Sequence, residues 1–296
     1  SNQRDNAMNM ICFFGIILCA CAQSLLAKAC SHSTNNPIYF NMEKALFAFL
    51  PFAAVVAVTS EPSRWFHAET AIFAFFFAVS LCISMYAGYQ ALKLGPVSLT
   101  SLIVSFSLII PCAYGILFLH EPITFFKSTG FVFLLAAILL TNGKREHNTV
   151  PVSKKWAKFT LLTLVSNGLC SCLQKQHQTK YPGLYLNEFM CDSMLFATLI
   201  FAAAFVISRR KTVSLLKTKK GIHKFGILSG FANAGVNFLT LALAACSDAS
   251  ALFPLISAGT IVSTSAAGIL LFRERLEKRQ LSALLAGFAA VVCLKL

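Results

Sequence analysis

The sequence predicts an all-α, polytopic membrane protein in which ten transmembrane helices form two inverted five-helix repeats. Three observations predict this fold: the chain is 57% hydrophobic and only 12% charged, long charge-free stretches recur along it, and its halves share an order of short motifs. Soluble domains carry about a quarter charged residues. Because water cannot accommodate so much apolar surface, we expect a bilayer to cover it.

Ten apolar stretches are candidate spans, since a helix needs about 20 apolar residues to cross the hydrocarbon. Those that reach this length are residues 8–27, 70–92, 97–119, 225–247 and 249–272. Shorter stretches, or stretches with a charge near one end, are residues 45–60, 123–142, 159–174, 185–208 and 280–296. A long charged side chain at a helix end can still reach the membrane surface.

A polar, basic linker at residues 144–158 divides the chain almost in half. We therefore expect residues 8–143 to form the first five-helix repeat and residues 159–296 to form the second.

Residues 1–7 form a polar N-terminal tail. We interpret this tail as a remnant of cloning and leave it out of the fold prediction.

Self-comparison supports the repeat. The segment ILFLHE at 116–121 matches ILLFRE at 269–274, and SLLAK at 24–28 matches SCLQK at 171–175. Since five spans is an odd number, the second copy enters the membrane from the opposite face. Inverted repeats are common in secondary transporters, where the substrate site lies at the repeat interface near the midplane.

The region from the end of the fourth span into the fifth contains Gly115, Glu121 and Gly130. In order and spacing these residues resemble the drug/metabolite transporter superfamily, in its EamA-like ten-helix branch. The second half keeps Glu274 but has Ala283 where the family usually has glycine. The resemblance implies a basket of ten helices around a central cavity, lined mainly by spans one, three, four, six, eight and nine. It also implies transport of small metabolites.

The net charge of +14 would suggest nucleic acid in a soluble protein, but here the basic residues cluster in short loops. Assigned by loop, 19 of the 25 Lys and Arg lie on one face. The positive-inside rule then places both termini outside a cell membrane, inner or plasma. Many members of the resembled family instead have both termini inside.

Polar side chains within the spans are candidates for a substrate-binding cavity, because such groups in lipid must find partners. The candidates are Gln23, Tyr86, Tyr89, Gln90, Asn167, Lys175, Asn233 and Asn237. Residues four apart share a helix face, as the two asparagines of span eight do. As alternatives, these asparagines hydrogen-bond neighbouring helices, the tyrosines anchor at the membrane surface, and Lys175 reaches that surface from a helix end.

Two further groups are candidates for coupling and for hinge motion. Glu188 and Asp192 lie four apart in span seven, and their mutual repulsion would favour a shared proton, which predicts proton or cation coupling. Alternatively, both are solvated and pair with Lys180 or a lipid headgroup. Pro111 and Pro254 interrupt spans four and nine, and such breaks mark a binding site or hinge in many transporters.

The sequence contains no catalytic motif and no nucleotide-binding fold, so we expect neither an enzyme nor a cofactor. The 11 cysteines lie mostly in apolar segments without a CxxC pattern, and we expect no metal site.

The predicted function is a secondary transporter for a small polar or amphipathic metabolite, such as an amino acid or amine. The alternative is a lipid or headgroup translocator, or a channel-like facilitator. The expected partners are a solute and the lipid bilayer, without nucleic acid, for a chain that acts as a monomer.

Overall fold

The computed structural model describes residues 2–33, 36–61, 65, 67–95, 100, 104, 106–121, 124–141, 153–211, 222–246 and 248–272, with 282, 285, 286, 289 and 293. Over these ranges the chain is helical and contains no strand, which confirms the all-α class. The helices are α1 (Asn2–Ser33), α2 (Pro37–Thr59), α3 (Ala68–Leu94), the 3-10 helix η2 (Phe106–Leu108), α5 (Ile109–Phe118), α6 (Phe125–Thr141), α7 (Lys154–Lys180), α8 (Leu186–Lys211), α9 (Ile222–Cys246) and α10 (Ala249–Phe272).

Five helical segments of the described chain are long and apolar enough to cross a membrane. They are Met10–Cys30, Pro37–Thr59, Ala68–Leu94, Leu186–Ser208 and His223–Ala245, which correspond to predicted spans one, two, three, seven and eight. Shorter apolar helical stretches cover Phe106–Phe118 and Leu255–Thr264. Most of the predicted tenth span lies outside the described residues. The chain is thus a multi-pass membrane protein.

Polarity is distributed in the opposite way to a soluble protein. Large apolar side chains lie on the outer surface, where Val58 is 86% exposed and Phe125 is 81% exposed. Polar side chains such as Asn41 and His177 are almost completely buried. Lipid can cover apolar groups but cannot satisfy polar ones, so this arrangement suits a bilayer.

Two helices extend beyond the predicted spans. Helix α1 begins at Asn2, so residues 2–7 of the polar tail form part of it, since neither glycine nor proline interrupts them. Helix α7 begins at Lys154, inside the predicted linker at 144–158. Its start follows from a cap, in which the Ser153 hydroxyl accepts a hydrogen bond from the Trp156 backbone N–H at 3.1 Å. The first part of the linker lies outside the described residues.

The predicted start of the second span at residue 45 is wrong, because α2 begins at Pro37. The Asn36 side chain accepts a hydrogen bond from the Tyr39 backbone N–H at 3.1 Å and caps the helix. Proline is well suited to the first helical position, where no donor is needed. Lys44, which the charge count assigned to a loop, therefore lies about two turns inside α2.

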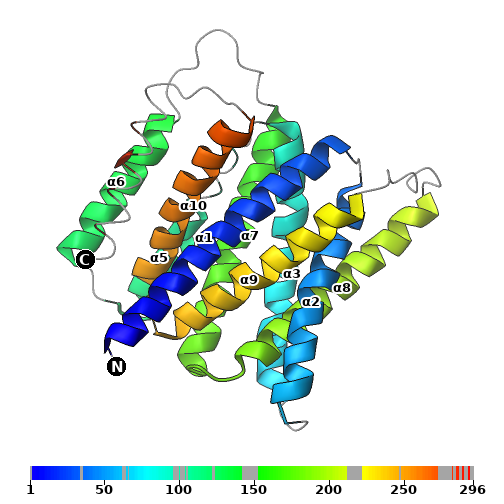
Figure 1. Cartoon of the computed structure of the whole chain (residues 1–296), viewed down its shortest axis with the longest axis horizontal. Helices are drawn as coiled ribbons and strands as arrows, with labels where there is room; N and C mark the ends of the chain where they lie inside the picture. Colours follow the sequence, from blue (N-terminus) through cyan, green and yellow to red (C-terminus); the bar gives the residue numbers. More distant parts are fainter. Residues whose placement is uncertain are drawn as a thin grey trace.

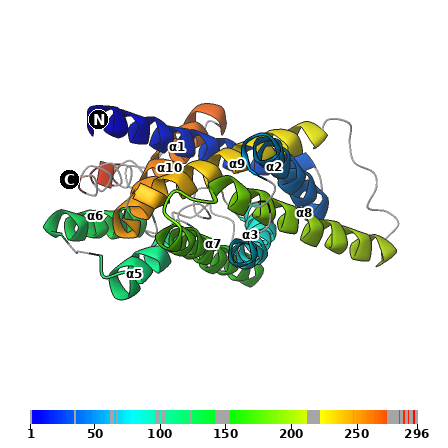
Figure 2. The same cartoon turned by 90° about the horizontal axis from the view of Figure 1, so that it is seen from below.

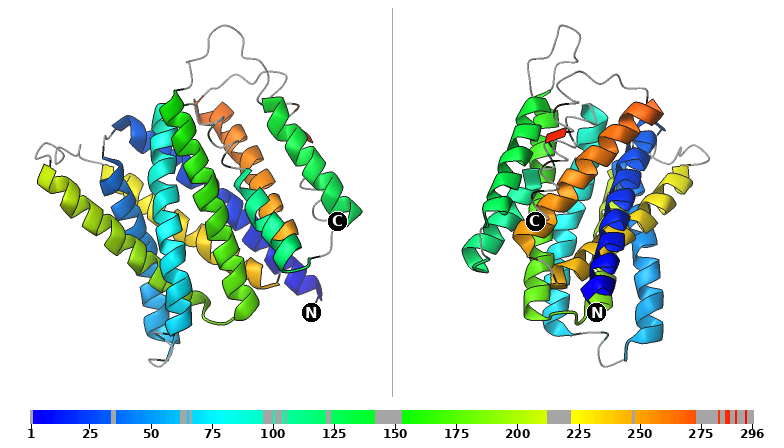
Figure 3. Two further views of the ribbon diagram at one scale, coloured as in Figure 1. Left: turned by 180° about the vertical axis from the view of Figure 1, so that it is seen from behind. Right: turned by 60° about the vertical axis from the view of Figure 1, so that its left-hand side comes forward.

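The helices of the first half pack against those of the second half. Helix α1 packs along α9 and α3 packs along α7, while α2 contacts α8 and α9 and α3 also contacts α8. Figure 3 shows α3 and α7 side by side, and in Figure 1 α6 and α8 lie at opposite edges of the bundle. Seen from below, α1, α9 and α2 lie on one side and α5, α7 and α3 on the other (Figure 2).

Glycines on α9 allow α2 to approach closely. A Cβ at Gly230 would lie 2.6 Å from the Phe47 Cβ and 2.8 Å from the Lys44 carbonyl oxygen. A Cβ at Gly226, one turn earlier, would lie 2.6 Å from the Glu43 carboxylate. Small residues four apart let helix backbones approach in membranes. This contact fixes the position of α2, and with it the face that carries Lys44.

Candidate functional site

A polar cavity of about 330 Å³ lies between helices of the first half of the chain and helices of the second half. Helices α1, α2, α3, α7, α9 and α10 contribute to it, together with residues near η2. Its lining residues are Ala20, Gln23, Ser24, Ala27, Phe40, Asn41, Lys44, Leu81, Ser84, Met85, Gly88, Tyr89, Leu92, Thr100, Val104, Ser107, Thr163, Asn167, Asn233, Val236, Asn237, Ile256, Ser257, Thr260 and Thr264. Sites of this volume hold small organic ligands.

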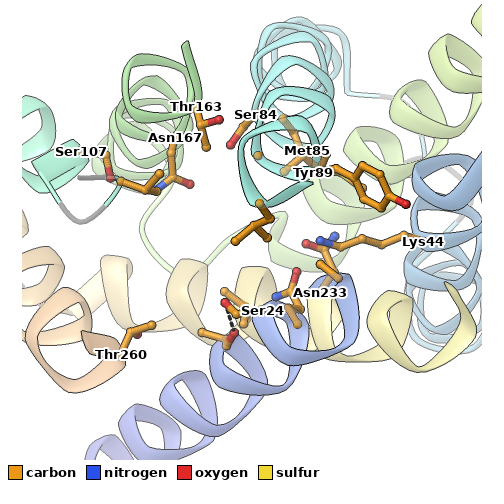
Figure 4. A pocket seen from close by; sticks show the side chains of 18 of the residues that line it. Ser24, Lys44, Ser84, Met85, Tyr89, Ser107, Thr163, Asn167, Asn233 and Thr260 are labelled. Atoms are coloured by element: carbon orange, nitrogen blue, oxygen red, sulfur yellow. Dashed lines mark hydrogen bonds between the residues drawn. The ribbon is translucent and has the colours of Figure 1, made fainter. Parts of the chain in front are cut away.

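Five of the residues proposed from the sequence line this cavity, namely Gln23, Tyr89, Asn167, Asn233 and Asn237. They come from α1, α3, α7 and α9, which are far apart in the sequence. In Figure 4, Asn167 and Ser107 lie across the cavity from Lys44 and Tyr89. The Asn167 amide donates a hydrogen bond to the Ser107 hydroxyl at 2.9 Å, which joins α7 to η2.

The other three candidates do not line the cavity. Gln90 donates a hydrogen bond to the Tyr86 hydroxyl at 3.2 Å, and the Tyr86 ring packs edge-on against Phe159. The Lys175 ammonium lies 3.7 Å from the Glu121 carboxylate, with side chains only 12% and 7% exposed. It also donates to the Ala244 carbonyl oxygen at 3.5 Å. Lys175 thus forms part of a buried ion pair.

Two of the cavity asparagines belong to a chain of side-chain amides. Gln174 on α7 donates to the Asn237 side-chain oxygen at 3.5 Å, and Asn237 donates to the Asn233 side-chain oxygen at 3.2 Å. All three side chains are at least nine-tenths buried. The chain of amides satisfies these polar groups and connects α7 to α9, so both roles considered for the asparagines coexist at this position.

Lys44 and its neighbour Asn41 are among the lining residues that sequence reasoning missed. The Lys44 side chain extends from α2 into the cavity towards Tyr89, Met85 and Asn233 (Figure 4). Lys44 is the one charged residue among the described residues of the lining. The signal that could have found it is the pair Asn36-Pro37, because a cap followed by proline predicts a helix start ahead of Lys44.

The carboxylates of span seven lie away from the cavity, in the contact between α8 and its neighbours. Glu188 and Asp192 are 8% and 5% exposed. The Ser60 hydroxyl donates to Glu188 at 2.7 Å, whereas one carboxylate oxygen of Asp192 has no hydrogen-bond partner within the described structure. Both carboxylates are therefore buried, not solvated.

Lys180 pairs with Glu69 at 2.6 Å instead of with the buried carboxylates of α8. The hydrogen bond to Glu69 raises the pKa of the Lys180 ammonium. The Tyr181 hydroxyl also donates to Glu69, and this bond raises the pKa of the phenol. Both partners of the ion pair are about half exposed, so this contact contributes little to stability.

The predicted hinge prolines occupy different helical environments. Pro111 is buried in the first turn of α5, directly after η2, where a missing N–H is tolerated. Pro254 lies within α10, and its side chain is not among those described. Sequence reasoning passed over Pro51, which lies inside α2 about two turns after Lys44.

The described residues contain no group of three or more His, Cys, Asp or Glu side chains that could hold a metal ion. The arrangement is instead a solute-sized cavity inside a helical membrane protein, bounded by helices from both halves of the chain. These features define the class, a multi-pass membrane protein with a central polar cavity.

Comparison with known proteins makes the class more specific. Residues 8–143 match the model of the EamA-like transporter family, which confirms the predicted resemblance and is consistent with the drug/metabolite transporter superfamily. The matched region, the first half of the chain, is thus similar to a family of membrane transporters. No curated protein matches the chain. A solved structure titled "Crystal structure of protein" is similar in fold, with a TM-score of 0.71 at 14% identity over 97% of this chain and 96% of that one.

Proposed function

We propose that this protein is a secondary transporter that moves a small polar solute across the cytoplasmic membrane by alternating access. The observation that carries this proposal is the position of the cavity, which is bounded by α1, α2 and α3 from the first half and by α7, α9 and α10 from the second. If one half rocks against the other, the cavity opens to one side and then to the other.

The helix contacts support the proposed ten-helix arrangement of two inverted repeats. If α1 corresponds to α7 and α3 to α9, exchanging the halves converts the α1–α9 contact into the α7–α3 contact. The same exchange, with α2 corresponding to α8, converts α2–α9 into α8–α3 and leaves α2–α8 in place. A two-fold relation between residues 8–143 and 159–296 accounts for all of these contacts.

The transport test uses purified protein in proteoliposomes. A carrier gives saturable uptake and counterflow of a solute, whereas a channel-like facilitator gives flux that does not saturate. Movement of labelled lipid between leaflets without solute flux would contradict the proposal and favour a lipid translocator. Empty liposomes and liposomes that contain an unrelated membrane protein are the controls.

Glu188 and Asp192 are our proposed coupling residues. Two carboxylates held out of water are expected to bind a proton in one state of the transporter and release it in the other. We expect Glu188→Gln to make uptake independent of a pH gradient while exchange of solute continues. Glu69→Gln, which removes an exposed carboxylate, is the matched control. Equal dependence on the gradient in wild type and both variants contradicts coupling at Glu188.

The charge distribution supports a proposed orientation with both termini outside. Lys44 has to be left out of the loop count because it lies within α2. The linker at 144–158 and the segment at 209–224 still place 12 of the 25 Lys and Arg on one side. A reporter that matures only outside the cytoplasm should be active when fused to the C-terminus. An active cytoplasmic reporter at the same position would reverse the orientation.

A further inference from the structure

We infer that Lys44 and Asn41 on α2 form a subsite for a carboxylate, so that the transported solute is an organic anion or a zwitterion. This inference rests on the proposed transport function and adds the chemical class of the solute. It narrows the expected solutes, because a simple amine would meet an unneutralised ammonium group in the cavity.

The two side chains share one face of α2. They are three residues apart, which places them on adjacent turns of the same side of the helix. Both line the cavity, and Asn41 is only 1% exposed. The cap at Asn36 and the close contact at Gly230 hold this part of α2 in place.

The donor groups of both side chains lack partners among the described residues. The Asn41 amide nitrogen is buried without a hydrogen-bond partner in the described structure. The Lys44 ammonium has no ion pair or hydrogen bond with any described residue. Buried donors are almost always paired, so the unpaired Asn41 amide nitrogen, beside a half-buried and unpaired Lys44 ammonium in the cavity lining, indicates a ligand that accepts hydrogen bonds.

The neighbouring acid does not neutralise Lys44. Glu43 accepts a hydrogen bond from the Tyr39 hydroxyl at 2.9 Å and contacts His223 on α9, outside the cavity lining. No aspartate or glutamate occurs among the described lining residues. The described lining therefore carries one positive charge without a counter-charge, which favours binding of an anion.

The rest of the cavity suits a carboxylate attached to a small, partly apolar body. Phe40, Met85 and Tyr89 provide apolar surface beside Lys44, while Gln23 and Ser84 provide polar groups for a second function on the solute. A carboxylate accepts several charge-assisted hydrogen bonds, as an ammonium and an amide together require. One lysine balances one carboxylate.

The experiment is a binding measurement on the full-length protein in detergent. The probes are benzoate, glutarate and leucine as carboxylates, with ethanolamine and tetramethylammonium as cations, each at millimolar concentration. We expect carboxylates to bind and raise the unfolding temperature, and cations to have no effect. Lys44→Met should weaken carboxylate binding by a factor on the order of 10–100, the loss of one charge-assisted hydrogen bond, and Lys44→Arg should restore part of it.

Lys180→Met is the matched control, because it removes the same charge from a residue that pairs with Glu69 outside the cavity. Asn41→Ala is a second, uncharged test of the same subsite. The inference is overturned if no carboxylate binds wild type, if cations bind better, or if Lys44→Met and Asn41→Ala both bind carboxylates with unchanged affinity. It is also overturned if phosphatidylglycerol stabilises the protein while no soluble carboxylate does.

Flux in proteoliposomes separates this inference from the proposed function. Binding of carboxylates that depends on Lys44, without saturable flux, would leave the subsite standing and refute the transporter. Saturable flux of amines that is unaffected by Lys44→Met would leave the transporter standing and refute the anion subsite.

Discussion

Lys44 and Lys175 are both held within the helical bundle, but their surroundings differ. Lys175 lies where α7 meets the end of α5, and Glu121 neutralises it at 3.7 Å. Lys44 extends into the cavity and has no such partner among the described residues. The comparison shows how a charge that stabilises the fold differs from one that is available to a ligand, although both are lysines inside the helical bundle.

The largest expected effect is on the stability conferred by Lys175. Lys175→Met leaves Glu121 buried without its cation and should cost about 3–5 kcal/mol of unfolding free energy. Lys44→Met removes an unpaired charge and should cost nothing, or even stabilise the fold. Thermal unfolding in detergent measures both. The double variant Lys175→Met/Glu121→Gln should regain most of the loss, and a large loss in Lys44→Met would erase the distinction between the two lysines.

A smaller effect is expected where α2 contacts α9. Gly230→Ala places a methyl group 2.6 Å from the Phe47 Cβ and should cost about 1–3 kcal/mol through overpacking. Because α2 must shift, carboxylate binding at Lys44 should weaken too. Gly235→Ala is the control, since its nearest neighbour is the Cys19 Sγ, at 3.0 Å on a side chain that can move. Equal unfolding temperatures for the two variants would show that the close contact is unimportant.

The smallest expected effect is the difference in stability between Asn237→Ala, which removes a hydrogen-bonded amide, and Asn41→Ala, which removes an unpaired amide nitrogen. Asn237→Ala breaks the hydrogen bonds with Gln174 and Asn233 and should cost about 1 kcal/mol. Asn41→Ala removes an amide nitrogen that has no partner, and it should leave stability unchanged while it weakens carboxylate binding. Chemical unfolding of both variants in the same detergent measures the difference. The opposite order of stability would mean that Asn41 has a structural role.

The helical class and the positions of most helices could be predicted from the sequence, because a helix that crosses the bilayer needs a long apolar stretch. Helix ends were harder to place. The charge of Lys44 ended an apolar stretch in the sequence, yet the capped start at Asn36-Pro37 carries the helix through it. Local capping chemistry therefore decided the boundary, and hydropathy did not.

Part of the cavity lining could be predicted because polar residues within apolar stretches are easy to recognise in the sequence. Asn167 and Asn233 are polar residues in the middle of apolar stretches, and both line the cavity. The ion pair between Lys175 and Glu121 joins residues far apart in the chain, and no local pattern indicates it. Whether a polar residue faces the cavity or another side chain depends on how the helices pack, which the order of residues does not reveal.

The unneutralised charge of Lys44 has a consequence for the energetics of a transport cycle. If the solute is an anion with a single carboxylate, the loaded cavity is neutral and the empty cavity carries one positive charge. A membrane potential acts on charge that moves across the field, at about 2.3 kcal/mol per elementary charge for each 100 mV. Voltage would then bias the return of the empty carrier and leave the loaded step unaffected, so the electrical gradient would set the direction in which the transporter resets.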